Sequence, residues 1–394
     1  MISVTEAIKM LQNQELNLPF VTLNVVEASQ YVLAEEIFSP IDMPTFAQSA
    51  MDGYAIHFDS WKKGAPLPIV GMIVAGETAT FTLKAGEAMR IFTGAPVPEG
   101  ADTVVMQEKV KVIDNQLYIE DEKLVKAANV RPKASQTAKN NLVVPKNTLL
   151  TAGRIGLLAS LGIEKVKLYA KPRVSLLITG KELIAAGNPL QHGQVYESNS
   201  ATLKAALAEM GIEISQKHLV SDELAATVTE IQHLLTQTDI LLITGGISVG
   251  DYDYVKTALE QIGVTQLFYK VAQKPGKPIY VGKLENKIIF ALPGNPASVH
   301  TCFYRYVKPF LLQTMGHFSP FEPTYYPTLT HDFEKNNALT LLLKAKLSPN
   351  GTVEILSHQE SYKMNSYVEA NGFVVIAAEK NVYGVGEKVA FFGY

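Results

Sequence analysis

The chain has 394 residues, 47% of them hydrophobic, which is enough for two to four domains with apolar cores. Its 35 basic and 38 acidic residues give a net charge of −3, which argues against a nucleic-acid-binding surface. A single cysteine, Cys302, excludes an internal disulfide and a cysteine-based metal site. Without a signal-peptide pattern or an apolar run of about 18 residues, we expect a cytoplasmic protein that does not enter a membrane.

The first 170 residues predict units of different composition. Ser3 and Glu6 form a capping-box pattern that opens an amphipathic helix. Residues 68–130 consist of short β-rich segments separated by Gly and Pro, which is typical of an antiparallel β domain. Residues 153–167 predict a helix that leads into a strand. We therefore expect two domains: a β-rich one over 46–130, and a discontinuous mixed α/β one over 1–45 and 131–170.

The segment 171–318 alternates strands with helices, which predicts a doubly wound, mainly parallel sheet. The expected strands are 174–179, 212–220, 240–244, 267–271, 278–282 and 288–292, and the expected helices are 201–210, 222–236, 254–262 and 297–315.

The chain from 319 to 394 opens with a proline-rich linker and continues in short strand-like stretches. This pattern predicts a small β barrel or sandwich. The sequence as a whole therefore predicts a multidomain α/β protein with a β-rich domain, a mixed α+β linker domain and a C-terminal small β barrel.

Ligands bind at the carboxyl ends of strands in such sheets, and the loops there carry chemically useful residues. The glycine-rich loop GGISVG, residues 245–250, follows a buried strand and leads into a helix. Its glycines let backbone N–H groups turn towards one anion, and the helix N-terminus adds partial positive charge. Asp251 and Asp253 beside it suit a phosphate bridged by a divalent cation. An ordinary tight turn with Asp253 as helix N-cap accounts for the same residues equally well.

Other loops add basic and hydroxyl groups. Lys274 and Lys277 in KPGKP stand on a rigid turn, where they can act as point charges on an oxyanion, although solvated surface lysines are common. Thr93 offers a hydroxyl at a strand end of the β-rich part. Asp52 stands in the tight-turn signal Asp52-Gly53, and closing that turn is its plainest role.

Six ordered blocks resemble the molybdopterin molybdenumtransferase family, whose eukaryotic relative is the E domain of gephyrin. The blocks are PIDMPTFAQSAMDGYA, MRIFTGAPVPEGADTVVMQE, TGKEL, GGISVGDYDY, KPGKP and LPGNPASV. The resemblance implies insertion of molybdenum from molybdate into adenylylated molybdopterin with release of AMP. It implies Mg²⁺ as cofactor, which neutralises charge while a phosphoanhydride is cleaved. It also implies an elongated homodimer with a composite active site and an upstream molybdopterin adenylyltransferase partner.

The resemblance assigns roles to single residues. Glu182 and Asp253 match the acidic pair near the metal and the phosphates, and Asp251 is a weaker metal ligand. Lys274 and Lys277 match the basic clamp for anionic substrates. Two residues of the β-rich part match functional positions that reach the opposite subunit, namely Asp52 and Thr93. The remaining residues expected to bind substrate are Gly245, Gly246, Ser248, Gly250, Pro293, Gly294, Asn295, Pro296 and Ser366.

Two positions depart from the family pattern. Lys181 stands where relatives usually carry an acid, and Gln136 stands where they carry an aspartate. An amide cannot supply charge to a cation, so we expect weaker cation affinity or turnover. A binding or scaffold protein with reduced or no turnover therefore stays open. So does a phosphate-ester hydrolase, although the retained lysines and the Asp52 block favour the transferase.

Overall fold

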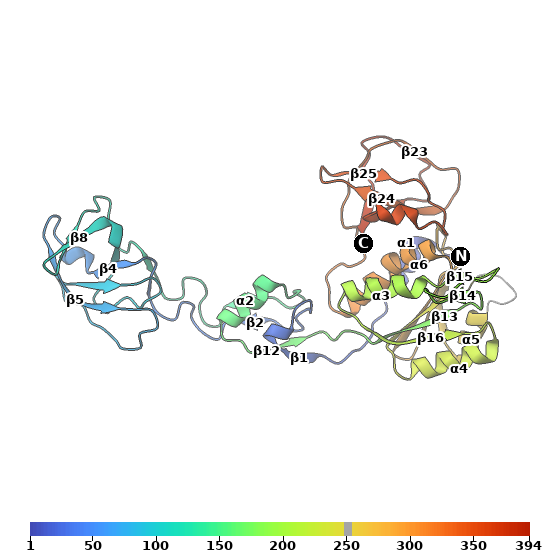
Figure 1. Cartoon of the computed structure of the whole chain (residues 1–394), viewed down its shortest axis with the longest axis horizontal. Coiled ribbons are helices and arrows are strands. Elements are labelled where there is room, and N and C mark those ends of the chain that lie inside the picture. The colour runs from blue at the N-terminus through green and yellow to red at the C-terminus, as the bar shows by residue number, and fades with distance from the viewer. Residues whose placement is uncertain (248–253) are drawn as a thin grey trace.

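The computed structural model of the protein describes residues 1–247 and 254–394. Its sheets are distributed along one long axis (Figure 1). A β-rich sheet lies at one end, small strand pairs with one helix lie in the middle, and the α/β sheet lies at the other end beside a C-terminal β unit. None of the helices in the described ranges has the length and apolar content needed to cross a bilayer.

The α/β unit is built on a six-stranded sheet of order β16-β13-β17-β21-β20-β18. The first four strands are parallel, while β20 and β18 are antiparallel to their neighbours, so the predicted mainly parallel sheet is confirmed. Helices α3 and α6 share one core with the sheet, and α4 and α5 share a second core on its other face. The bounds are β13 Val174–Thr179, β16 Ile214–Val220, β17 Ile240–Thr244, β18 Thr265–Tyr269, β20 Tyr280–Leu284, β21 Lys287–Leu292, α3 Asn199–Glu209, α4 Leu224–Leu235 and α5 Tyr254–Ile262.

The helix predicted over 297–315 is interrupted. It runs as α6 (Pro296–Cys302), a π-helical turn η4 (Phe303–Val307) and α7 (Lys308–Thr314). Pro309 in the first turn of α7 has no backbone N–H to donate to the carbonyl four residues earlier, so regular α-helical bonding cannot continue through this point. The wider turn directly before the proline turns the buried side chains of η4 into the core.

The N-terminal helix α1 (Val4–Gln12) begins with the predicted capping box. The Ser3 hydroxyl accepts the Glu6 N–H, and the Glu6 carboxylate accepts the Ser3 N–H. Its buried face, including Leu11, belongs to the same core as the α/β sheet, although the sequence groups residues 1–45 with 131–170. The predicted domain boundaries themselves stay a prediction.

The β-rich unit is a six-stranded sheet of order β7-β4-β6-β5-β9-β8. Most of its pairs are antiparallel, as predicted, but β5 and β6 are parallel. The long connection between them gives the chain room for the crossover that a parallel pair requires. The bounds are β4 Gly53–Ile56, β5 Leu67–Ile73, β6 Ala88–Ile91, β7 Thr103–Met106, β8 Val110–Ile113 and β9 Gln116–Ile119.

The middle of the molecule consists of short strand pairs and α2 (Ala152–Ser160), with a small apolar core of its own. The pairs here are β1 with β12 and β2 with β11. The pair of β3 with β10 lies at the edge of the β-rich unit, since Gln48 bridges Pro96 and Val130 packs against the core of that unit. The bounds are β1 Val21–Asn24, β2 Ile37–Phe38, β3 Gln48–Ser49, β10 Val130–Arg131, β11 Leu142–Val144 and β12 Lys165–Leu168.

The C-terminal unit is a sheet of order β22-β25-β24-β26-β28. A bridge between Thr328 and Lys388 brings its two end strands together, so the sheet closes into the predicted small barrel. β19, which belongs to the α/β unit in sequence, pairs with β24 and joins the two units. The bounds are β19 Gln273–Lys274, β22 Thr328–Leu329, β23 Phe333–Glu334, β24 Thr340–Leu347, β25 Thr352–Ile355, β26 Gly372–Ile376, β27 Val382–Tyr383 and β28 Ala390–Gly393.

Candidate active site

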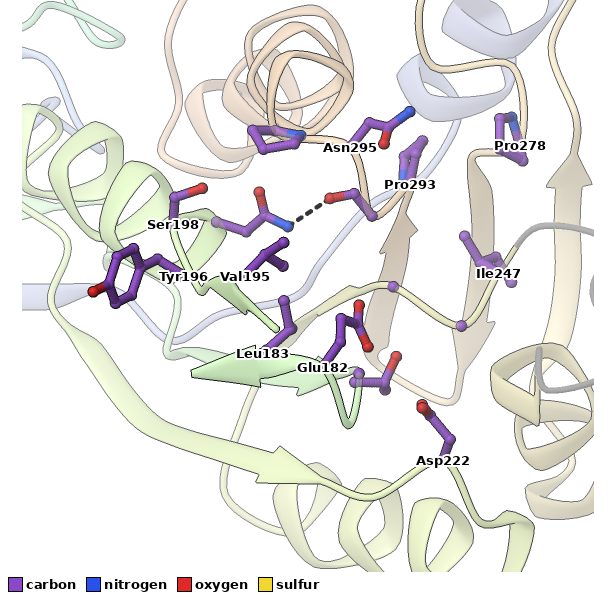
Figure 2. Close-up of a pocket in the computed structure, with 17 residues that line it drawn as sticks. Glu182, Leu183, Val195, Tyr196, Ser198, Asp222, Ile247, Pro278, Pro293 and Asn295 are labelled. Carbon is purple, nitrogen blue, oxygen red and sulfur yellow. Dashed lines mark hydrogen bonds between the residues drawn. The ribbon is translucent and has the colours of Figure 1, made fainter. Parts of the chain in front are cut away.

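A cavity of about 640 Å³ opens at the carboxyl ends of β13, β17 and β21. Its lining comes from the loops after these strands, from the short parallel pair β14 (Leu183–Ile184) and β15 (Val195–Tyr196), and from the start of α3 (Figure 2). This is where open parallel sheets bind ligands. The structure brings together here the following predicted site residues: Glu182, Gly245, Gly246, Pro293, Gly294, Asn295 and Pro296.

Glycine is required at the start of the loop after β17. Gly245 has φ +85°, and a Cβ there would lie 2.6 Å from the Thr179 carbonyl oxygen. Gly246 has φ +60°, and its Cβ would lie 2.8 Å from a methyl group of Val255. The loop therefore packs against β13 and α5 with bare backbone facing the cavity. The predicted roles of Ser248, Gly250, Asp251 and Asp253 fall outside the described residues.

The loop after β21 forms the facing wall. A Cβ on Gly294 would lie 3.7 Å from the Gly245 Cα, so the two loops are in close contact. Asn199, at the start of α3, donates its side-chain N–H to the Gly294 carbonyl at 2.8 Å (Figure 2). The Asn199 side-chain oxygen is buried and has no partner among the described residues. Asn199 itself lines the pocket, although this oxygen lies beneath its surface.

Two carboxylates line the pocket, those of Glu182 and Asp222 (Figure 2). The Asp222 carboxylate accepts the backbone N–H of Lys181 at 3.2 Å, which ties the loop after β13 to the segment after β16. Carboxylate oxygens are the ligands that Mg²⁺ prefers. Among the described residues, no group of three or more His, Cys, Asp or Glu side chains is arranged to hold a metal ion. The described part of the pocket thus supplies two hard oxygen donors.

Sequence reasoning missed Asp222, which it treats only as the start of a helix. The signal that points to it is its position two residues after Val220, where the parallel strand β16 ends. Side chains just past the carboxyl ends of parallel strands meet at one edge of the sheet. Asn199 was missed for a different reason, because no predicted strand end lies next to it.

The KPGKP loop borders a second, smaller cavity of about 290 Å³. Pro278, Pro293 and Asn295 line both cavities, so the two are neighbours. Lys274 and Lys277 are exposed, whereas Pro275 and Gly276 between them are buried. The C-terminal unit closes the far side, where the Asn295 side chain donates to the Ser361 hydroxyl at 2.9 Å.

Ser366 has a different environment from that expected. It is buried in the short 3₁₀ turn η5 (Asn365–Val368). Its hydroxyl lies 2.9 Å from the Ser357 carbonyl and 3.0 Å from the His358 carbonyl, and donates to this pair. The hydroxyl thus holds the segment that presents Ser361 to the second cavity, and Ser366 itself does not line either cavity.

Asp52 and Thr93 meet in the β-rich unit. The Asp52 carboxylate accepts the Thr93 N–H and hydroxyl, each at 2.8 Å. These two hydrogen bonds, together with the nearby charge of Arg90, hold the pKa of Asp52 below its usual value. Gly53 begins β4 rather than closing a tight turn, and a Cβ there would lie 1.9 Å from the Val105 carbonyl oxygen.

Within one chain this pair does not reach the pocket. Asp52 directly precedes β4, Glu182 directly precedes β14, and these two strands lie at opposite ends of the molecule (Figure 1).

Three family models match the chain in order. They are the MoeA N-terminal region (domain I and II) over residues 2–162, the probable molybdopterin binding domain over 175–313, and the MoeA C-terminal region (domain IV) over 328–392. A molybdopterin molybdenumtransferase of Haemophilus influenzae is 35% identical over 381 residues, 94% of each chain. The chain belongs to the molybdopterin molybdenumtransferase family.

Other members of the molybdopterin molybdenumtransferase family agree in extent. One from Staphylococcus aureus is 30% identical over 396 residues, covering 98% of this chain and 94% of that protein. The crystal structure of a molybdopterin biosynthesis MoeA protein from Pyrococcus horikoshii gives a TM-score of 0.84 at 26% identity and covers 100% of both chains. The resemblance drawn from the sequence blocks is therefore confirmed, together with the multidomain fold class.

The two departures from the molybdopterin molybdenumtransferase pattern lie in different places. Lys181 precedes Glu182, which lines the pocket, and its backbone N–H donates to the Asp222 carboxylate. Gln136 is exposed in the segment between β10 and β11, where its N–H donates to the Met43 carbonyl at 2.9 Å. Gln136 does not line either cavity of its own chain.

Proposed function

We propose that this chain inserts molybdenum from molybdate into adenylylated molybdopterin and releases AMP, as a step of molybdenum cofactor biosynthesis. In this reaction the phosphoanhydride to AMP is cleaved and the dithiolene of the pterin takes the metal. The single observation that carries the proposal is the pocket at the strand ends, in which Glu182, Asp222 and two bare glycine loops face one cavity. Curated relatives of similar length bear the name molybdopterin molybdenumtransferase.

The residues of the pocket suit a flat, phosphorylated ligand. Gly245 and Gly246 line the pocket with backbone atoms alone, and Asn199 lines it with a side chain that is held by the Gly294 carbonyl. Leu183 and Val195 supply an apolar wall opposite the glycines. This distribution of a few polar groups on an apolar lining is typical of sites that bind small molecules.

The lysines give the site its positive charge. Lys274 and Lys277 expose their side chains at the second cavity, which adjoins the pocket through Pro278, Pro293 and Asn295. We assign them to the binding of anionic substrates, molybdate included, because an ammonium group attracts an oxyanion as a point charge.

The donor set fits Mg²⁺. Glu182 and Asp222 would hold it together with Asp253, and Asp251 is a further acidic neighbour in sequence. Mg²⁺ commonly uses only one or two carboxylates and completes its shell with phosphate oxygens and water. When bound, the ion neutralises the charge that develops on the phosphates during cleavage.

We further propose that the active enzyme is a cytoplasmic homodimer. Asp52 and Thr93 are ordered by their mutual hydrogen bonds. However, β4, which follows Asp52, lies at the opposite end of the molecule from β14, which follows Glu182 (Figure 1). A second copy can bring its β-rich unit to the pocket of the first, which gives a composite site. A molybdopterin adenylyltransferase would supply the adenylylated substrate.

A binding or scaffold protein without turnover is the second candidate. It is favoured by Lys181, because a cation next to Glu182 in sequence, where relatives usually carry an acid, lowers the negative charge available to hold Mg²⁺. Such a protein would bind molybdopterin species and release no AMP.

The deciding experiment incubates the purified protein with adenylylated molybdopterin, molybdate and Mg²⁺, and measures AMP and metal-loaded pterin together. Both products should appear in equal amounts and only with all three additions. AMP without metal-loaded pterin would point to a hydrolase, and tight binding without either product would point to the scaffold.

A further inference from the structure

The backbone of the KPGKP loop is held from inside the protein by buried polar side chains. Gln273 at its root is completely buried. Its side-chain N–H₂ donates to the Pro275 carbonyl at 3.0 Å and lies 3.4 Å from the Gly276 carbonyl. Its side-chain oxygen accepts a hydrogen bond from the Tyr306 hydroxyl. The amide therefore connects the helical core to the two residues between the lysines.

The tip of the loop is sealed against the same group of side chains. The Cys302 thiol lies 3.8 Å from the Gly276 carbonyl and 3.7 Å from the Gln273 side-chain nitrogen. Gly276 has φ +82°, and a Cβ there would lie 2.3 Å from the Cys302 sulfur. Only glycine fits at this position, so the loop backbone packs directly against Cys302 and Gln273 in a single close-packed arrangement.

Tyr306, which reaches the loop through Gln273, lies in the irregular part of the helix. It belongs to the π-helical turn η4 and is fully buried. Burial raises the pKa of the Tyr306 hydroxyl, so the hydroxyl keeps its proton and remains a donor to Gln273. On the other side, Gln273 and Lys274 form β19, which pairs with β24 of the C-terminal barrel. The root of the loop is thus fixed by both units.

We infer that Gln273 and Tyr306 are positioning residues for anion binding, which act by fixing the Lys274–Lys277 loop so that both ammonium groups face one anion. This inference rests on the proposed anion-binding role of the two lysines. Neither Gln273 nor Tyr306 needs to touch the anion. Their polar groups make hydrogen bonds in the fully buried interior, and the side-chain N–H₂ of Gln273 donates directly to the loop backbone. Apolar side chains of the same size would fill this space but would not fix the orientation of the loop carbonyls.

The test compares two buried tyrosines of one helix. Tyr306→Phe removes the donor to Gln273, and Tyr304→Phe removes a hydroxyl that donates to Glu209 at 3.1 Å, away from the loop. The full chain is titrated with molybdate and with AMP by calorimetry. Hydrogen exchange of the segment 271–279 is followed by mass spectrometry. We expect Tyr306→Phe to raise the Kd on the order of tenfold, since small misplacement of a charged group is costly, and to speed exchange in this segment alone.

Tyr304→Phe should leave both the Kd and the exchange of the segment unchanged. Gln273→Met keeps the side-chain length and should reproduce the effect of Tyr306→Phe. It replaces Tyr306→Phe as the test variant if the latter does not fold. Tyr306→Phe and Gln273→Met proteins that melt earlier but keep the wild-type Kd and loop exchange would overturn the inference, since the network would then be structural only.

The double variant Lys274→Ala/Lys277→Ala separates the inference from the proposed function. It should lose most of the anion affinity. If it binds both anions like the wild type, or if the wild type binds neither, the proposed anion-binding role of the lysines is wrong. The inference about Gln273 and Tyr306 is then wrong as well. If it loses affinity while Tyr306→Phe and Tyr304→Phe behave alike, only the positioning role is wrong.

Discussion

The carboxylate of Asp52 receives two hydrogen bonds from a single residue, Thr93, one from its N–H and one from its hydroxyl. Two donors from one residue fix both the position of the carboxylate and its charge. Because hydrogen bonds to the ionised form favour it, the pair lowers the pKa of Asp52 and extends its ionised range to more acidic pH.

Thr93→Val should raise the pKa of Asp52, because the hydroxyl is lost while the backbone N–H remains. Carbon-13 NMR titration of the carboxyl group measures this shift, and Thr93→Ser is the control that keeps the hydroxyl. The pKa of Asp52 is lowered in the folded chain, so its ionised form stabilises the fold above the unfolded pKa of about 3.9. That contribution is lost as the pH falls through the folded value, and Thr93→Val should make it smaller. An unchanged pKa in the valine variant would mean that the Thr93 hydroxyl does not contribute to the shift.

Asp52 and Glu182 lie far apart in space within one chain, and this separation allows a test of the composite site. Asp52→Asn and Glu182→Gln proteins should each be inactive alone. When the two are co-expressed and associate at random, half of the dimers are mixed, and each mixed dimer holds one site with both residues intact. Activity should then return to about one quarter of the wild-type value per site. No recovery in verified mixed dimers would show that both residues must belong to one chain.

Asp222→Asn tests the acidic side chain that the sequence did not single out. Asparagine keeps an acceptor for the Lys181 N–H but removes the charge, so the loop should stay in place while cation binding weakens. The Mg²⁺ concentration for half-maximal AMP release should rise on the order of tenfold, since affinity follows the number of charged ligands. Glu223→Gln is the control, because Glu223 is the exposed neighbouring residue and its substitution removes the same charge. Equal Mg²⁺ dependence in both variants would remove Asp222 from the metal site.

Gly276→Ala tests how tightly the lysine loop is packed. A methyl group there meets the Cys302 sulfur at 2.3 Å, and φ is +82°. Gly64→Ala is the matched control, because φ is +85° but no atom lies within 4 Å of the added Cβ. We expect the Gly276 variant to lose about 1–3 kcal/mol of unfolding free energy beyond the control in urea titration.

The double variant Gly276→Ala/Cys302→Ala completes this experiment, since removal of the sulfur opens room for the methyl group. Its loss of stability should be smaller than the sum of the two single losses. Additive losses would indicate that the backbone conformation alone makes glycine necessary at this position.

The α/β unit was the most predictable part of the fold. The strands expected at 174–179 and 240–244 coincide with β13 and β17, and the helix expected at 254–262 coincides with α5. These strands are buried along their whole length, so their apolar runs bounded by glycine leave little choice of structure. For these strands, the local sequence pattern and burial in the folded protein both favour a β-strand.

Features that depend on distant neighbours were not predictable. The parallel pairing of β5 with β6 depends on where a long connection returns. Pro309 signals an interruption of the helix, but whether the helix breaks or continues through a π-helical turn depends on the packing around it. Asp222 belongs to the pocket only because β16 lies beside β13 at the edge of the sheet. The loops at 179–182 and 292–296 were predictable, because each follows an apolar strand of the predicted parallel sheet, and family motifs mark them as well.

The buried tip of the lysine loop also bears on the thermodynamics of binding. A flexible loop loses conformational entropy when it closes around a ligand, and that loss is subtracted from the affinity. Here Pro275 and Gly276 are already packed in the interior before any ligand arrives. The loop is preorganised, so the conformational entropy that the protein loses when it captures an anion comes mainly from the two exposed lysine side chains.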